Sequence, residues 1–200
     1  FHMPRTAEQN NAIKDKRREK ILQSSLRVFA NANYDKVAID DINKASHCSH
    51  GLFYHYFVSK EAVFRYVCEE IVFPSKITEK IQAIHPLHGM AGIEAVAKFV
   101  EELQAEGPTE RYVALLILRD AGLERVKESG IDLHKKADLA GDFCRFVSEA
   151  QKEGKIMEGE PLDIAYAFLQ VAYAAINKQH NVGVPPRTLD AKFLCSLITK

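Results

Sequence analysis

Residues 17–64 are RREKILQSSLRVFANANYDKVAIDDINKASHCSHGLFYHYFVSKEAVF, and this stretch decides the fold. Apolar residues recur at three-to-four spacing and predict a long amphipathic helix over residues 10–31. A repeat at every third position predicts a second, short helix over 39–45. Ser49 is a typical N-cap for a third short helix, which runs to Tyr56. Two short helices separated by a three-residue turn are typical of a helix-turn-helix.

A fourth helix follows, and it marks the end of the first domain. Ser59 is its expected cap, and Glu61 lies in the first turn, where the helix dipole favours an acid. Pro74 lacks a backbone N–H, so it should kink or interrupt this helix. We therefore expect two domains, residues 4–66 and residues 67–200.

The remainder of the chain also has helical periodicity. Alternating apolar and polar residues, the pattern of a strand, are not found, so the sequence predicts an all-α fold. The breaks between the expected helices coincide with glycine and proline. The helices are expected over residues 92–106, 109–127, 133–153, 162–178 and 189–198.

Charge and cysteine content narrow the class of protein. The net charge is zero, yet residues 1–66 carry eleven Lys and Arg against seven Asp and Glu, while residues 67–200 carry sixteen against twenty. A basic first domain favours a polyanionic partner. The four cysteines form no Cys-x-x-Cys pair, which argues against a disulfide framework and favours a reducing, cytoplasmic setting. No apolar run approaches the roughly 18–20 residues that span a bilayer, so we expect no membrane partner.

Residues 17–64 resemble the DNA-binding domain of the TetR family of transcriptional regulators. The resemblance implies an N-terminal three-helix helix-turn-helix DNA-binding domain joined to a C-terminal helical ligand-binding and dimerisation domain. It also implies a homodimer that represses transcription from a palindromic double-stranded DNA operator until a small-molecule effector releases it. The matching residues, in family order, are Ile21-Leu22, Leu26, Phe29-Ala30, Tyr34, Asp41-Ile42, Ala45, Ser49, Gly51, Tyr54-His55-Tyr56-Phe57 and Ser59-Lys60-Glu61.

The third helix is the expected DNA-recognition helix, because it places small and hydrogen-bonding residues directly after a turn. Phe53 and Phe57 are four apart and should anchor its opposite face in the core. If the third helix did not follow a turn and a cap, the run Tyr54-His55-Tyr56 would instead indicate packing in the core or a solvated surface. The basic residues of the first helix would likewise indicate only a solvent-exposed helix face. The expected DNA contacts are Ser49, His50, Gly51, Leu52, Tyr54 and His55, with Lys60 at a helix N-terminus and Lys16, Arg17 and Arg18 on helix one as phosphate contacts.

Three positions depart from the family pattern. His47 stands where the turn usually has glycine, so a positive φ and some strain are expected there. The pair Val37-Ala38 replaces residues with hydroxyl side chains, which removes a cap and a phosphate contact from helix two. Cys48 replaces a small aliphatic residue and should pack as a small hydrophobe.

The C-terminal half offers candidate ligand-binding residues and a dimer surface. Arg119 interrupts an apolar run and is suited to an anionic effector, but Asp120, Glu124 or another protomer would serve equally as its partner. We expect dimerisation through the last two helices, where alanines would allow close approach, although a helix pair within one chain fits the same residues. The candidate ligand-binding residues are Tyr112, Arg119, Tyr166, Gln170, Tyr173 and Asn177.

Other classes of function are less well supported. The motifs Gly-x-Ser-x-Gly, Ser-x-x-Lys, His-Glu-x-x-His and the Gly-x-x-x-x-Gly-Lys phosphate loop are absent, so no enzyme, cofactor or metal is expected. His85 and His88 could ligate a metal together with His134 or Cys144, but a proline separates the first two. A thiol- or metal-responsive regulator that uses Cys68, Cys144 and Cys195 remains an alternative. A helical module that does not bind DNA is the second alternative.

Overall fold

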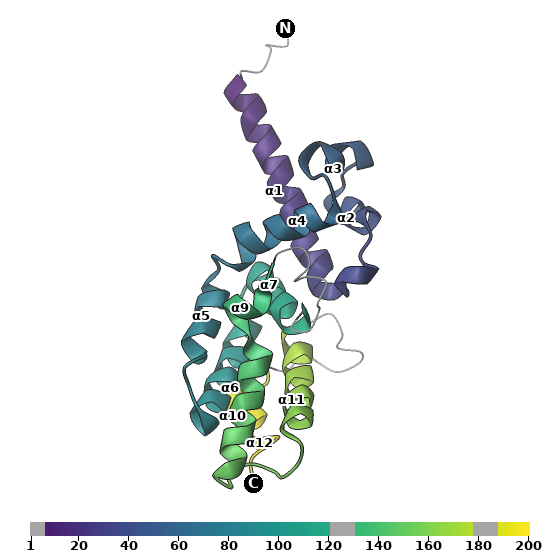
Figure 1. Ribbon diagram of the computed structural model, residues 1–200. Helices are drawn as coiled ribbons and strands as arrows, with labels where there is room; N and C mark the ends of the chain where they lie inside the picture. Colours follow the sequence, from purple (N-terminus) through teal and green to yellow (C-terminus); the bar gives the residue numbers. More distant parts are fainter. Residues whose placement is uncertain (1–6, 121–130, 178–187) are drawn as a thin grey trace.

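The computed structural model describes residues 7–120, 131–177 and 188–200, and the regular elements within them are helices (Figure 1), which confirms the predicted class. The helix-turn-helix region lies at one end and the longer helices of the C-terminal half at the other. In chain order the elements are α1 (Ala7–Asn31), the short turn η1 (Tyr34–Lys36), α2 (Ile39–Ser46), α3 (His50–Tyr56), α4 (Lys60–Val67), the π-helical turn η2 (Cys68–Val72), α5 (Lys76–Ile84), α6 (Gly89–Ala105), α7 (Pro108–Asp120), α9 (Leu133–Ala137), α10 (Leu139–Lys152), α11 (Pro161–Ile176) and α12 (Ala191–Ser196).

An aromatic cluster holds η1 and α4 against α1. The ring of Phe29 meets that of Phe64 edge-on, with centroids 4.9 Å apart, and stacks on Tyr34 at 5.7 Å. All three side chains are buried. Helices as short as α2 and α3 are unstable alone in water, and burial of their own apolar side chains, Ile42 and Phe53, keeps them in place. The first turns of α1 project beyond the rest of the fold (Figure 1).

A π-helical turn joins the two halves of the molecule. The amide of Phe73 donates to the carbonyl of Cys68 over 2.8 Å, which is the i to i+5 bond of a π-helix. Pro74 has no N–H with which to continue the helix. The hydroxyls of Ser75 and Thr78 instead donate to the carbonyl of Val72, at 2.6 and 2.7 Å. The predicted interruption at Pro74 is confirmed, because α5 begins two residues later.

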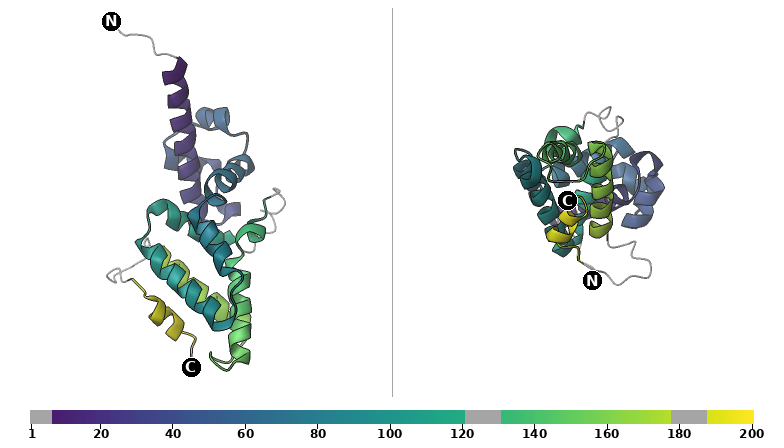
Figure 2. Two further views of the ribbon diagram at one scale, coloured as in Figure 1. Left: turned by 90° about the vertical axis from the view of Figure 1, so that its left-hand side faces the viewer. Right: turned by 90° about the horizontal axis from the view of Figure 1, so that it is seen from below.

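The C-terminal half is built around α6, which packs against α10, α11 and α12 (Figure 2). Gly92 permits the close approach of α6 and α10, since a Cβ there would lie 2.4 Å from the ring of Phe146. Helix α7 packs against α1 and so connects the two halves a second time. One hydrophobic core therefore runs through both halves of the molecule.

Two expected helices have different limits in the structure. The helix predicted over 133–153 is divided into α9 and α10, because the Asp138 side chain accepts from the Gly141 amide at 3.0 Å and starts a new helix. The last helix is shorter than predicted. Beyond it, the Ile198 carbonyl accepts from the Met157 amide at 2.8 Å in an isolated antiparallel bridge. Residues 121–127 of the helix predicted over 109–127 lie outside the described part of the chain.

Candidate functional site

Helix α3 is fixed at its start and along one face. The Ser49 hydroxyl accepts from the Leu52 amide at 3.2 Å, which confirms the predicted N-cap. Phe53 and Phe57 are fully buried, with ring centroids 5.8 Å apart, so the prediction that they anchor α3 is also confirmed. Burial of this face turns the opposite face of α3 toward solvent.

That solvent-facing surface carries most of the residues expected to contact DNA. Tyr54 is 50% exposed, and a Cβ added to Gly51 would meet nothing within 4 Å. His50 hydrogen-bonds through Nε2 to Asp40 on α2, which holds its ring on the surface. Leu52 is the exception, because it is half-buried. The exposed residues of this surface are Ser49, His50, Gly51, Tyr54 and His55. Their hydrogen-bond donors and acceptors and the open backbone at the glycine suit contact with base edges in a major groove.

The turn before α3 has the predicted left-handed residue. His47 has φ 55° and ψ 42°, the conformation usually given to glycine. The Cys48 amide then donates to the Asn43 carbonyl at 3.0 Å and closes α2. The Cys48 sulfur is half-buried and lies 3.1 Å from both Asn43 Oδ1 and Ser46 Oγ, so its surroundings are more polar than expected.

The start of α2 has lost its hydroxyl cap, as predicted. Ala38 occupies the N-cap and offers no side-chain acceptor. Asp41 compensates in part, because its Oδ2 accepts from the Ala38 amide at 2.9 Å. This keeps half of a capping box.

Lys60 does not point where the sequence suggested. Its Nζ donates to the carbonyls of Tyr34 and Val37, at 2.9 and 3.1 Å, and lies 4.4 Å from the centre of the Tyr34 ring. These carbonyls lie at either end of η1, and that of Tyr34 also accepts from the Val37 amide at 3.2 Å. The side chain is therefore used inside the domain, and the expected phosphate contact has no support from its geometry.

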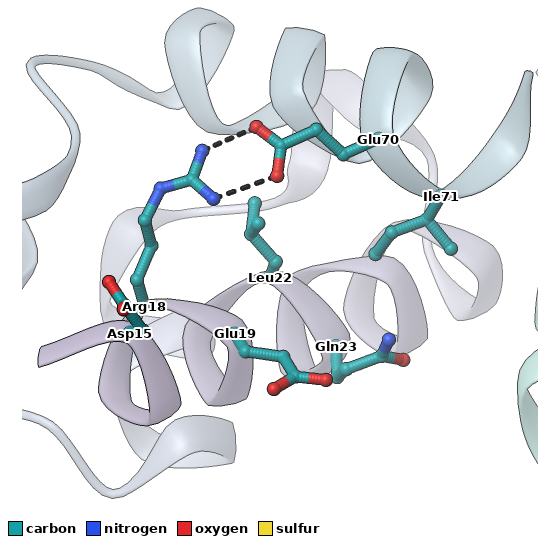
Figure 3. Close-up of a pocket in the computed structure, with 7 residues that line it drawn as sticks. All are labelled: Asp15, Arg18, Glu19, Leu22, Gln23, Glu70 and Ile71. Atoms are coloured by element: carbon teal, nitrogen blue, oxygen red, sulfur yellow. Dashed lines mark hydrogen bonds and ion pairs between the residues drawn. The ribbon is translucent and has the colours of Figure 1, made fainter. Parts of the chain in front are cut away.

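Arg18 is also engaged within the molecule (Figure 3). Its guanidinium donates to both carboxylate oxygens of Glu70 on η2, with 2.7 Å between Nη1 and Oε2, and lies 4.9 Å from the centre of the Tyr66 ring. This hydrogen bonding raises the pKa of Arg18 and lowers that of Glu70. Asp15 and Glu19 line the same hollow, so it would repel a phosphate. Among the residues of α1 that were expected to contact DNA phosphates, Lys16 and Arg17 are exposed.

A cleft of about 470 Å³ lies between the end of α1, α7 and α11. Four of the six predicted ligand-binding residues line it. Tyr112 does not, and Asn177 is buried beside it, where its side-chain amide donates to the Tyr173 hydroxyl at 3.3 Å. Sequence reasoning missed four lining residues. Asn33 and Ala140 come from distant segments without a local signal, and Leu118 and Leu169 lack the polar tip by which the candidates were chosen. The lining residues are Asn33, Leu118, Arg119, Ala140, Tyr166, Leu169, Gln170 and Tyr173.

Arg119 links this cleft to α1. Its Nη1 donates to Asn33 Oδ1 at 3.2 Å, its Nη2 donates to the Tyr173 hydroxyl, and its guanidinium carbon lies 5.1 Å from the centre of the Tyr173 ring. The Tyr173 hydroxyl in turn lies 3.3 Å from the carbonyl of Ala30 on α1. The side chains of Asp120 and Glu124, the alternative partners of Arg119, lie outside the described part of the structure.

The surroundings of the cysteines and histidines favour structural roles over a redox or metal site. Cys68 is fully buried, and burial followed by the charge of Glu94 raises the pKa of Cys195, which disfavours the reactive thiolate. His85 Nδ1 lies 2.9 Å from Asp142, and His88 Nδ1 lies 3.2 Å from Glu149. Within residues 7–120, 131–177 and 188–200, no cluster of three or more His, Cys, Asp or Glu side chains is arranged to hold a metal ion. The side chain of His134 is not among those described.

None of the described helices is both long enough and apolar enough to cross a membrane.

Comparisons with known proteins agree with this arrangement. Residues 21–67 match the family described as bacterial regulatory proteins, tetR family. The HTH-type transcriptional repressor Rv1474c of Mycobacterium tuberculosis is 31% identical over 189 residues, which cover 94% of each chain. A bacterial regulatory protein in the tetR family from Rhodococcus RHA1 has a similar fold, with a TM-score of 0.54, 16% identity and coverage of 90% of this chain and 94% of its own. The MbdR regulator from Azoarcus sp. CIB has a TM-score of 0.50, 20% identity and coverage of 90% and 93%.

Proposed function

Because this chain belongs to the tetR family of bacterial regulatory proteins, we propose that it represses transcription from a palindromic DNA operator, which it leaves when a small molecule binds. Members of the family are DNA-binding regulators rather than enzymes. The observation that carries the proposal is the solvent-facing surface of α3, with Tyr54 half exposed above an anchored opposite face. In this proposal residues 4–66 bind DNA, and residues 67–200 bind the effector and form the dimer.

The proposed division of DNA contacts follows exposure. His50, Tyr54 and His55 would meet base edges in the major groove, and Gly51 would let the DNA backbone approach. Lys16 and Arg17 would contact phosphates, which position the protein without selecting a sequence. Arg18 and Lys60 are left out of this set, because both cations already have partners within the chain.

The proposed dimer uses the exposed apolar side chains of α11 and α12. Leu162 is 63% exposed, Tyr166 65% and Phe193 48%. Leu162 and Tyr166 are four positions apart on α11 and so lie on one face of it, and neighbouring large apolar side chains on a surface are typical of an interface. A two-fold axis through this surface would pair the same residues from each protomer. Operator binding would further require the dimer to hold its two α3 helices at the roughly 34–36 Å that separates successive major grooves on one face of DNA.

Release of the operator would result from binding in the cleft around Arg119. The cleft is in direct contact with the end of α1, so an occupant that displaces Arg119 also acts on the DNA-binding domain. Such coupling requires the effector to prefer the DNA-free form, typically by about 1–3 kcal/mol.

Selection of bound duplexes from a random-sequence DNA pool tests the proposal. The purified protein should enrich an inverted repeat with half-sites about one helical turn apart. Tyr54→Ala, which keeps the buried face of α3 intact, should enrich no such sequence. If the folded wild-type protein enriches nothing at low and moderate salt, the proposed operator binding is wrong.

A further inference from the structure

In the described part of the structure, the guanidinium of Arg119 is paired with neutral groups. Among the described residues its partners are the neutral oxygens of Asn33 and Tyr173, and no described carboxylate lies within ion-pair distance. Its Nε is buried without a hydrogen-bond partner in the same set. A half-buried cation with neutral acceptors and one vacant donor is better satisfied by an anion.

The rest of the cleft determines what kind of anion would fit. Leu118, Ala140 and Leu169 give it apolar walls, and the rings of Tyr166 and Tyr173 add flat faces. Gln170 supplies a neutral polar group. Arg119 is the one cationic side chain among the described lining residues, so the set matches a single negative charge on an apolar body better than a multiply charged phosphate.

We infer that this cleft binds a small monocarboxylic acid, with its carboxylate on Arg119 and its apolar body between the leucines and tyrosines. A carboxylate accepts two parallel hydrogen bonds from a guanidinium, and these are stronger than bonds to neutral oxygens. The ligand therefore competes directly with Asn33 Oδ1 and the Tyr173 hydroxyl for the same hydrogens.

That competition gives the acid a route to the DNA-binding domain, and this step rests on the proposed function. Asn33 is the N-cap residue of η1, and the first carbonyl of η1, that of Tyr34, accepts from Lys60 at the start of α4. When the carboxylate of the acid binds Arg119, the hydrogen bond from Arg119 on α7 to Asn33 is lost. The same thermodynamic coupling requires operator DNA to weaken binding of the acid.

Calorimetric titration of the full chain with benzoate and octanoate tests the site, with benzamide as the uncharged match for benzoate. Both acids should bind, and benzamide should bind at least about tenfold more weakly, the effect expected for losing hydrogen bonds to a charged group. Arg119→Gln should reduce affinity for benzoate by a similar factor. Arg111→Gln changes a guanidinium on the same helix outside the cleft and should leave it unchanged. A thermal melt of each variant checks that it is folded.

The outcomes separate the two proposals. Equal binding of benzoate and benzamide, no binding of either acid, or unchanged binding in folded Arg119→Gln would overturn the acid site. Binding of benzoate by a chain that enriches no operator would support the site and contradict the proposed repression. Where an operator is bound, Asn33→Ala removes one competing acceptor from Arg119, so it should bind benzoate at least as tightly as the wild type and lose most of the effect of benzoate on DNA binding. If Asn33→Ala retains the full effect, the coupling route is wrong.

Discussion

The guanidinium of Arg18 donates to both carboxylate oxygens of Glu70, fifty-two positions later in the chain. The pair fastens α1 to the π-helical turn η2 (Figure 3). Tyr66 packs against the guanidinium. Both side chains are partly exposed, at 32% and 41%, so water screens the pair and limits its strength.

Removing the Glu70 carboxylate should lower the stability of the protein at neutral pH but not at acidic pH. Glu70→Gln should lower the free energy of unfolding at pH 7 by about 0.5–1 kcal/mol, or the melting temperature by about 1–4 °C. Arg18 lowers the pKa of Glu70, so this stabilisation is present above the unfolded-state pKa of about 4.3 and is lost as pH falls through the lower folded value. Thermal melts across this range measure it. Glu69→Gln, which removes an exposed neighbouring carboxylate, is the matched control for the loss of one negative charge.

The neighbours Arg17 and Arg18 should respond differently to salt. Arg17 is exposed, so Arg17→Gln should reduce the slope of log affinity against log salt by about 0.9 per protomer, or about 1.8 for a dimer. Arg18→Gln should leave the slope unchanged and lower the melting temperature instead. Operator titrations at several salt concentrations give both slopes. Equal reductions would show that Arg18 leaves Glu70 to contact DNA.

Gly51→Ala should make the protein more stable and a poorer DNA binder. A Cβ at this position has no neighbour within 4 Å, and alanine favours a helix over glycine, so stability should rise by about 0.5 kcal/mol. The added methyl would push the DNA backbone away and cost about tenfold in operator affinity. Tyr54→Ala is the comparison, because it should lose affinity without gaining stability. Unchanged affinity in Gly51→Ala would mean that DNA does not approach α3 here.

The strained turn at His47 predicts a stabilising substitution. Its φ of 55° costs an L residue more than it costs glycine, so His47→Gly should raise the free energy of unfolding by about 0.5–1 kcal/mol. Lys44→Gly, inside α2, should lower it by about 1 kcal/mol. Urea unfolding measures both. A loss of stability in both variants would show that the histidine makes contacts that outweigh the strain.

Local sequence signals predicted most of the fold. The caps Ser49 and Ser59, the break at Pro74 and the buried pair Phe53 and Phe57 depend on neighbours within a few positions, and each is present in the structure. The division at Asp138 was missed, because aspartate within an apolar rhythm is compatible with a continuous helix until its side chain is seen to cap.

The cations of the site were harder to predict, because their partners are distant in sequence. Arg18 and Arg119 have partners 52 and 86 positions away, and no local pattern encodes such a pair. Lys60 lies at a helix start, where phosphate contact is the usual expectation, but tertiary packing brings two carbonyls within its reach. Residue type indicated which side chains mattered, and the fold determined what they contact.

The π-helical turn η2 has a consequence for how relatives of this protein could diverge. It contains one residue more than an α-helical turn would, so losing a single codon within Cys68–Val72 would restore α-helical spacing while the residues on either side keep the faces they present. An in-frame deletion of that size leaves the helix-turn-helix and the cleft intact in sequence. One mutational event could therefore shorten the connection between the two halves of the molecule by one residue without changing which side chains pack on either side of it.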